Sequence, residues 1–210
     1  MSKRTNSILT LSNKRGVDLL APKAGDIDFG VLAEHLAKTN RYNGATPGVA
    51  YSVADHCVIG ASEIMQQEGD YEIASYFLLH DGHEAFLGDD TTPKKRAIAV
   101  VAEQAFGVLA SSVMEAFDQL ADRFDAAIHE AAGLAWPPSP DMKLRIKHWD
   151  LRMFVTEWRD LMRGVEHPDP QAYAGIPLLD REIHPQHWVH ARNQFADYVH
   201  LLLDKRRASR

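Results

Sequence analysis

Apolar residues recur with a helical period along almost all of the chain after about residue 25, and this periodicity limits the fold more than any other feature. Alternation typical of a strand is confined to residues 7–12, with residues 17–20 as the expected hairpin partner. No internal repeat, low-complexity stretch or linker divides the helical part. The sequence therefore predicts an all-α protein, a single helical bundle that follows a short N-terminal β-hairpin.

Loops rich in glycine and proline are expected to separate the helices. The first helix begins after Asp26, the expected N-cap, and carries Ile27, Val31, Leu32 and Leu36 on one face. Further helices are expected over about residues 51–67, 71–87, 94–109, 112–133, 141–163 and 186–203, with loops at 41–48, 88–93 and 166–185. We expect three parts: an extension over 1–25, a core over 26–163, and a loop with a C-terminal helix over 164–210 that packs on the core.

Composition and charge narrow the classes of function. The chain has 23 Lys and Arg against 29 Asp and Glu, which gives a net charge of −6. Proteins that bind a long nucleic acid usually carry an excess of basic residues, so this charge argues against that class of function. Cys57 is the only cysteine, which rules out an intramolecular disulfide and fits a reducing compartment. The first seven residues do not read as a signal peptide, and no run approaches the ~20 apolar residues of a membrane span. We therefore expect a cytoplasmic protein without membrane contact.

Metal-ligand side chains occur at three places within expected helices. These are Asp55-His56, then His80-Asp81 followed by His83 and Glu84, and finally Asp150. An ionised carboxylate is costly to bury without a partner. A divalent cation held by two imidazoles and two carboxylates solves that problem, and such a set leaves positions open for water. Adjacent helical residues lie about 100° apart, so His80 and Asp81 can reach one ion, with Glu84 on the same face beside a bound water.

Each position also has a structural explanation when it is taken alone. His56 in an apolar stretch is typical of a core histidine bonded to a carbonyl group. His80-Asp81 is also typical of a polar pair on a helix surface. Asp150, close to Lys147 and Arg152, is typical of a solvated helix face. Only the joint pattern favours a metal centre over these readings.

The joint pattern resembles the signature of the HD superfamily of metal-dependent phosphohydrolases. The local context is similar to the bacterial 5′-deoxynucleotidase branch over about residues 26–163. The resemblance rests on Tyr51–His56, on the run Leu79-His-Asp-Gly-His-Glu-Ala-Phe-Leu-Gly-Asp89 with Pro93 and Lys95 after it, and on Ile146–Asp150 with Glu157. It implies a single HD-domain helical bundle.

The resemblance also implies roles for individual residues. The metal ligands would be His56, His80, Asp81 and Asp150. Glu84 would be the acid/base residue that orients the attacking water, and Asp89 would lie near the sugar and that water. Arg41 would contact phosphate, and Lys95 would lie on the substrate side. Tyr42 stands where the nucleotidases carry a tryptophan, a departure that weakens the expectation of strict deoxyribose selectivity. Apart from the resemblance, Arg41 is also typical of an exposed cation on a Gly-rich loop.

These observations predict a phosphohydrolase with one divalent metal ion per chain, which removes phosphate from a nucleotide by attack of a metal-activated water. A (deoxy)nucleoside 5′-monophosphate is the expected substrate. A nucleoside triphosphate, another small phosphate ester, and a non-catalytic nucleotide- or metal-binding module are the alternatives. A second metal would need more histidines than His83, His129 and His148, so we expect a mononuclear site. Mn, Co, Mg, Zn, Ni and Fe all suit the ligand set, and amphipathic C-terminal helices are compatible with a homodimer.

Overall fold

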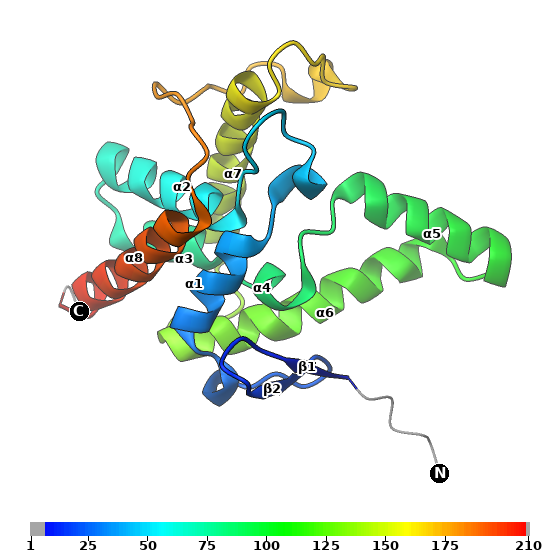
Figure 1. The fold of residues 1–210 in the computed structure, drawn as a ribbon, viewed down its shortest axis with the longest axis horizontal. Coiled ribbons are helices and arrows are strands. Elements are labelled where there is room, and N and C mark those ends of the chain that lie inside the picture. The colour runs from blue at the N-terminus through cyan, green and yellow to red at the C-terminus, as the bar shows by residue number, and fades with distance from the viewer. Residues whose placement is uncertain (1–6, 209–210) are drawn as a thin grey trace.

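The computed structural model describes residues 7–208, with side chains to residue 205, and confirms an all-α fold with a small N-terminal hairpin (Figure 1). Its elements are β1 (Ile8–Thr10), β2 (Gly16–Asp18), η1 (Ala24–Asp26), α1 (Phe29–Lys38), η2 (Arg41–Gly44), α2 (Val53–Gln67), α3 (Tyr71–Leu79), α4 (Glu84–Leu87), α5 (Thr92–Phe106), α6 (Ala110–Ala132), α7 (Pro140–Leu161), η3 (Pro170–Tyr173) and α8 (Trp188–Ala208). The parts of the expected end segments at 1–6 and 209–210 lie outside the described residues. Among the described residues, no helix combines the length and the apolar character that crossing a membrane requires.

The hairpin pairs β1 with β2 in antiparallel register, with Leu9 opposite Val17. Its strands are shorter than the sequence pattern predicts, because the chain already turns after Thr10 and Lys14 adopts a positive φ of 66°. Leu11 and Val17 are buried and belong to the same apolar cluster as the helices. The hairpin is thus anchored on the helical core.

The centre of the molecule is the pair α2 and α3, which α1, α7 and α8 cover. Gly60 of α2 makes the close approach of this pair possible, since a Cβ there would overlap the buried ring of Phe77 on α3. The apolar side of α8 lies in the same core through Phe195 and Leu202, both fully buried. The amphipathic character of this helix is therefore explained by packing within the chain, and it is not an argument for a dimer.

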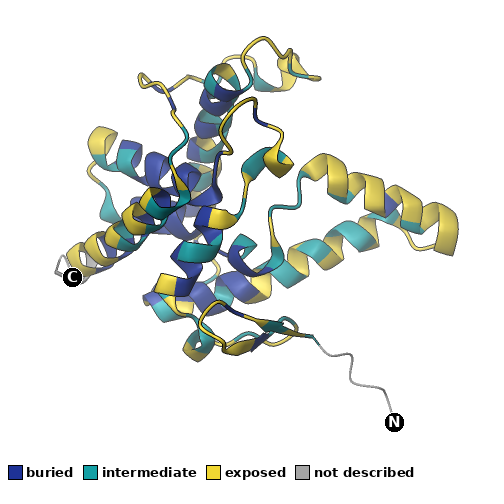
Figure 2. Cartoon of the chain, in the orientation of Figure 1, coloured by how far each residue is buried: buried dark blue, intermediate teal, exposed yellow. Residues whose placement is uncertain are grey.

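Helices α5 and α6 form an arm that extends away from the body (Figures 1 and 2). Ala99 is the only buried residue of α5, and the base of α6 enters the core through Phe124 and Ile128. Both helices lie within three residues of their predicted bounds. The periodicity thus predicted the helices correctly, although most of α5 is exposed rather than packed.

The continuous helix expected over 71–87 is wrong, because the chain turns between α3 and α4. The amide of Gly82 donates to the carbonyl of Leu79 at 2.9 Å, and that of Glu84 to the carbonyl of Asp81 at 3.0 Å. These three-residue hydrogen bonds replace the helical ones over residues 80–83. His80 and Asp81 therefore occupy a turn at the end of α3, not a helix face, and Glu84 begins the short helix α4.

The expected N-cap of the first helix is also wrong by two residues. Asp28 caps α1, accepting hydrogen bonds from the amides of Gly30 and Val31 at 2.9 and 3.2 Å. Asp26 lies in η1 and accepts from the amide of Lys23. Aspartate is a preferred N-cap residue, so the sequence alone allows either position. The position of the first helical turn decides which of the two acts as the cap.

Candidate metal centre

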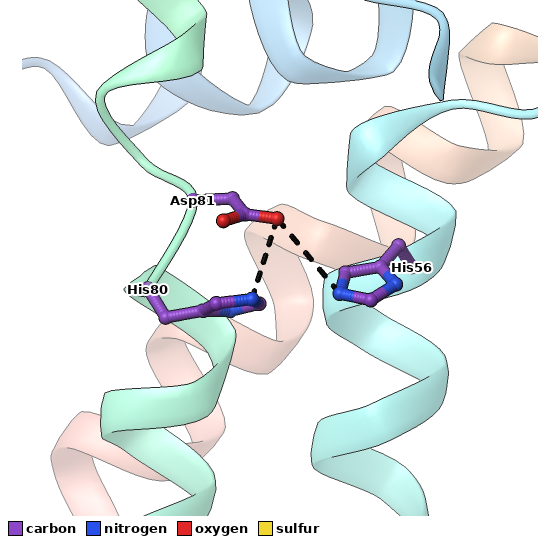
Figure 3. Close-up of side chains that lie close together, drawn as sticks. All are labelled: His56, His80 and Asp81. Atoms are coloured by element: carbon purple, nitrogen blue, oxygen red, sulfur yellow. Dashed lines mark ion pairs between the residues drawn. The ribbon is translucent and has the colours of Figure 1, made fainter. Parts of the chain in front are cut away.

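Four of the predicted side chains converge from three segments of the core. His56 comes from α2, His80 and Asp81 from the turn after α3, and Asp150 from α7. Oδ2 of Asp81 lies 3.3 Å from Nε2 of His80 and 3.8 Å from Nε2 of His56 (Figure 3). Oδ1 of Asp150 approaches the same two nitrogens at 4.0 and 3.6 Å. Asp150 also contacts Nζ of Lys147 at 2.8 Å through its other oxygen, so its carboxylate faces the centre and solvent at once.

Hydrogen bonds on the far side of each ring fix the imidazole tautomers. Nδ1 of His80 lies 2.6 Å from the carbonyl oxygen of Phe77, which can only accept a proton, so Nδ1 carries the hydrogen. Nδ1 of His56 lies 2.5 Å from the carboxylate of Glu157, which the charge of Arg41 helps to keep ionised. In the neutral form of each ring, Nε2 therefore carries the lone pair, which is directed into the centre.

The two imidazole Nε2 atoms are the centre's unpartnered polar atoms among the described residues, and both are buried. They face carboxylate oxygens, and a lone pair opposite a carboxylate is unfavourable unless a proton or a cation lies between them. His56, His80 and Asp81 each offer a ligand atom, and these atoms lie within 4.8 Å of one another. This group could hold a metal ion, and two imidazole nitrogens with a carboxylate suit a divalent cation.

Protonation of the two groups at the end of α3 supports this assignment. Burial lowers the pKa of His80, which favours the neutral ligand form. Burial alone would raise the pKa of Asp81, but the neighbouring imidazoles of His80 and His56 and the charge of Arg41 hold it well below its usual value. The pair is therefore a neutral nitrogen donor beside an anionic oxygen donor at neutral pH.

Glu157 of α7 supports the site, a role that the sequence did not predict although the residue belongs to the resemblance. Its fully buried carboxylate accepts from Nδ1 of His56 at 2.5 Å, from the hydroxyl of Tyr42 at 2.7 Å and from Nε of Arg41 at 3.3 Å. Burial opposes its ionisation, yet the charge of Arg41 and the His56 contact lower its pKa to about 2. The spacing in the sequence could have indicated this role. Glu157 follows Asp150 by seven residues, close to two helical turns, so both lie on one face of α7.

Arg41 lies at the start of a loop that is mostly exposed, as predicted, but its own side chain is only 13% exposed. Its amide donates to the carbonyl of Tyr51 at 2.9 Å, which ties the loop to the start of α2. Its guanidinium bridges the site, with Nη1 3.2 Å from Asp81 and Nε on Glu157. Tyr42 and Asn43 follow with φ values of 56° and 54°, a left-handed conformation that costs about 1–2 kcal/mol per non-glycine residue. Strain held beside a charged cluster is typical of functional loops.

Three further predicted residues lie within electrostatic reach of this cluster. Burial raises the pKa of Glu84 to about 10, and the charges of Asp81 and Asp89 add to the shift. Burial raises the pKa of Asp89 as well, against the opposing charge of Arg41. Lys95, in the first turn of α5, lowers the pKa of both carboxyls. One oxygen of Glu84, Oε2, is buried without a hydrogen-bond partner among the described residues, so it is available to a molecule in the site.

Tyr42 joins the cluster to a group of aromatic rings on the outer part of α7. Its ring lies 6.3 Å from that of Phe154 and 6.2 Å from that of Trp158. His167 and Tyr173, from the segment expected as a plain loop, pack against the same rings, and residues 170–173 form η3. Tyr42 is thus fixed by ring packing and by its bond to Glu157, rather than free at a loop tip.

Asp55 and His83, which lie close to the predicted ligands in the sequence, form structural contacts elsewhere. Asp55 turns away from its neighbour His56, accepting from the hydroxyl of Ser52 at 2.9 Å and from the amide of Gln186 at 3.4 Å. Nδ1 of His83 lies 3.0 Å from Asp125 of α6, and this contact outweighs burial and raises the pKa of His83. Among the described residues, no group besides His56, His80 and Asp81 gathers three ligand atoms closely enough for a metal ion.

No family model matches the chain. An uncharacterized protein of Rhodobacter capsulatus is 36% identical over 147 residues, which make up 67% of this chain and 65% of that protein. The uncharacterized protein YfdR of Escherichia coli K12 is 31% identical over 136 residues, or 65% of this chain and 62% of that protein. The chain therefore spans slightly less than two thirds of the length of each of these curated relatives.

Proposed function

We propose that the protein is a divalent-metal-dependent phosphohydrolase of the HD type, resembling the 5′-deoxynucleotidases, and that it acts in the cytoplasm. The observation that carries the proposal is the pair of buried, unpartnered Nε2 lone pairs of His56 and His80 opposite the carboxylate of Asp81. Asp150 is proposed as the fourth ligand, because its oxygen approaches both nitrogens. One ion per chain is proposed, since one group of three close ligand atoms occurs among the described residues.

The substrate is proposed to be a (deoxy)nucleoside 5′-monophosphate. A divalent ion in this centre would supply Lewis acidity toward phosphoryl oxygens and would lower the pKa of water. Arg41 is held beside Asp81 with its guanidinium edge in the site, which suits contact with a phosphate. Lys95 adds positive charge on the same side, as its effect on Glu84 and Asp89 indicates. Positioning and charge stabilisation of this kind account for most of phosphoryl-transfer catalysis.

Glu84 is proposed to move the proton of the reaction. Its raised pKa of about 10 means that the carboxyl keeps a proton at neutral pH until a positive charge arrives in the site. In hydrolysis, the oxygen of water bonds to phosphorus, the bond from phosphorus to the ester oxygen breaks, and the leaving oxygen takes up a proton. Glu84 can accept the proton of the water and relay it to that oxygen. Asp89 is proposed to orient the same water and the sugar, and Tyr42 to pack beside the sugar.

The test is phosphate release from a panel of nucleoside mono- and triphosphates with Mn²⁺, Co²⁺, Mg²⁺, Zn²⁺, Ni²⁺ or Fe²⁺. Asp81→Ala and Glu84→Gln should each lower turnover at least a hundredfold, whereas Asp118→Asn on the exposed side of α6 should not change it. Release of triphosphate or pyrophosphate, instead of inorganic phosphate, would indicate a triphosphate substrate. Metal and nucleotide binding without any turnover would indicate a binding module. Homodimer formation stays a prediction, which light scattering tests.

A further inference from the structure

A pocket of about 240 Å³ adjoins the metal centre on the side of α6 and α7. It shares His80 and Asp150 with the centre, and the rest of its wall comes from Tyr76, His129, Trp136, Pro138, Lys143, Ile146 and Lys147. None of the residues that belong to the pocket alone was predicted as a site residue. Pockets for whole drug-sized ligands begin at about 300 Å³, so this volume suits one part of a nucleotide rather than all of it.

Three aromatic rings form the wall of the pocket. The ring of Tyr76 stacks on that of His129 with centroids 5.4 Å apart, and the indole of Trp136 lies 4.6 Å from His129. The hydroxyl of Tyr76 donates to the carbonyl of Ala135 at 2.9 Å, which fixes the ring. Rigid aromatic walls of this kind bind planar heterocycles by stacking.

The polar groups around the pocket favour a particular edge of a heterocycle. Lys143 and Lys147 lie one helical turn apart on α7 and are exposed. Nζ of Lys147 already contacts Oδ2 of Asp150 at 2.8 Å, so Lys143 is the N–H donor assigned to a ligand. Nδ1 of His129 lies 2.7 Å from the carbonyl oxygen of Asp125, so it carries the hydrogen and leaves Nε2 as an acceptor. The Watson–Crick edge of a nucleobase, which places an acceptor next to an N–H donor, complements this combination.

We infer that this pocket binds the base of the nucleotide whose phosphate lies at the metal centre. The inference rests on the proposed function, because it assigns a second part of the same substrate. The shared residues His80 and Asp150 make the pocket continuous with the centre, so one molecule can extend from one to the other. Trp136 and Lys143 are therefore assigned to base recognition.

The first experiment measures binding without turnover. Thymidine, guanosine and adenosine are titrated against tryptophan fluorescence of the whole protein. All three nucleosides should quench it saturably. Trp136→Leu should abolish the signal, whereas Trp188→Leu on α8 should retain it. Absence of saturable quenching by every nucleoside, or a signal that survives in Trp136→Leu, would overturn the inference.

The second experiment compares dTMP with 2-deoxyribose 5-phosphate, which lacks a base. Trp136→Leu and Lys143→Met should lower kcat/KM for dTMP by tenfold or more relative to kcat/KM for the sugar phosphate. Lys143 is exposed, so Lys143→Met tests the inference even if Trp136→Leu folds poorly. Equal losses on both substrates would overturn the inference while leaving the hydrolase proposal intact. Nucleoside binding without phosphate release from either substrate would instead contradict the hydrolase proposal and leave the base pocket standing.

Discussion

Glu157 accepts a hydrogen bond from Nδ1 of His56 at 2.5 Å, and both side chains are completely inaccessible to solvent. The two residues lie 101 positions apart in the chain, on α7 and α2. This bond determines which nitrogen of His56 faces the centre. A carboxylate behind a ligating imidazole fixes the ring and raises its basicity, and losing such a partner typically costs about 10- to 100-fold in metal affinity.

Glu157→Gln should therefore weaken binding of Co²⁺ or Mn²⁺ by about 10- to 100-fold, as measured by isothermal titration calorimetry. The amide keeps the shape of the side chain but removes the charge that polarises His56 and balances Arg41. Glu115→Gln, on the exposed part of α6, serves as the control and should bind metal as the wild type does. Unchanged affinity in Glu157→Gln would show that this carboxylate does not support the metal site.

Replacing Gly60 by a larger residue is predicted to lower the stability of the fold. In Gly60→Ala, the new methyl group would overlap the fully buried Phe77 ring, whose centroid lies 4.5 Å from that of His80. Overpacking should lower the free energy of unfolding in urea by about 1–3 kcal/mol, despite the higher helix propensity of alanine. Gly25→Ala has no heavy atom within 4 Å of its new methyl group and should leave stability nearly unchanged. Equal stability of the two variants would contradict the described approach of α2 to α3.

Asp160 should make stability depend on pH. Burial opposes its ionisation, but hydrogen bonds from Arg159 and from the amide of Ile183 lower its pKa below the usual value. A lowered folded-state pKa adds stability that is complete above the unfolded pKa of about 3.9 and is lost as pH falls through the folded value. Asp160→Asn should therefore be less stable by about 1.5 kcal/mol at pH 7, and the difference should shrink below about pH 4.

Chemical denaturation at pH 7 and at several values below pH 4 measures this difference, with Asp118→Asn as the exposed control. Subtracting the variant from the wild type removes the contribution of the other acids that titrate in the same range. A difference that stays constant from pH 7 to pH 2 would show that the charge of Asp160 does not hold residues 179–183 against α7.

Most of the helices were predictable because each buries one regular apolar stripe. The turn after α3 was not, because the apolar residues Leu79, Ala85 and Phe86 continue the pattern across it. Gly82 was the only local sign of a break, and a single glycine is weak evidence within a helical pattern. The error changes how His80 and Asp81 reach the centre, since a turn rather than a helix face presents them.

The convergence of His56, His80 and Asp81 was predictable from residue types and from the resemblance, but the residues that support them were not. Glu157 in α7 is indistinguishable by type from a surface charge until the fold places it behind His56. His129 was considered as a ligand for a second metal, and its place in a stacked wall with Tyr76 and Trp136 depends on the crossing of α3 and α6. Contacts between segments far apart in the chain set both roles, and local periodicity does not report such contacts.

Metal stoichiometry tests the central claim most directly. The dialysed protein is titrated calorimetrically with Co²⁺, and bound metal is then measured by elemental analysis of the wild type, of His80→Ala and of His187→Ala. The account predicts one tightly bound ion per chain in the wild type and in His187→Ala, whose histidine is exposed near the start of α8, and none in His80→Ala. Undiminished binding in His80→Ala, or no binding by the wild type of any divalent metal named above, would contradict it.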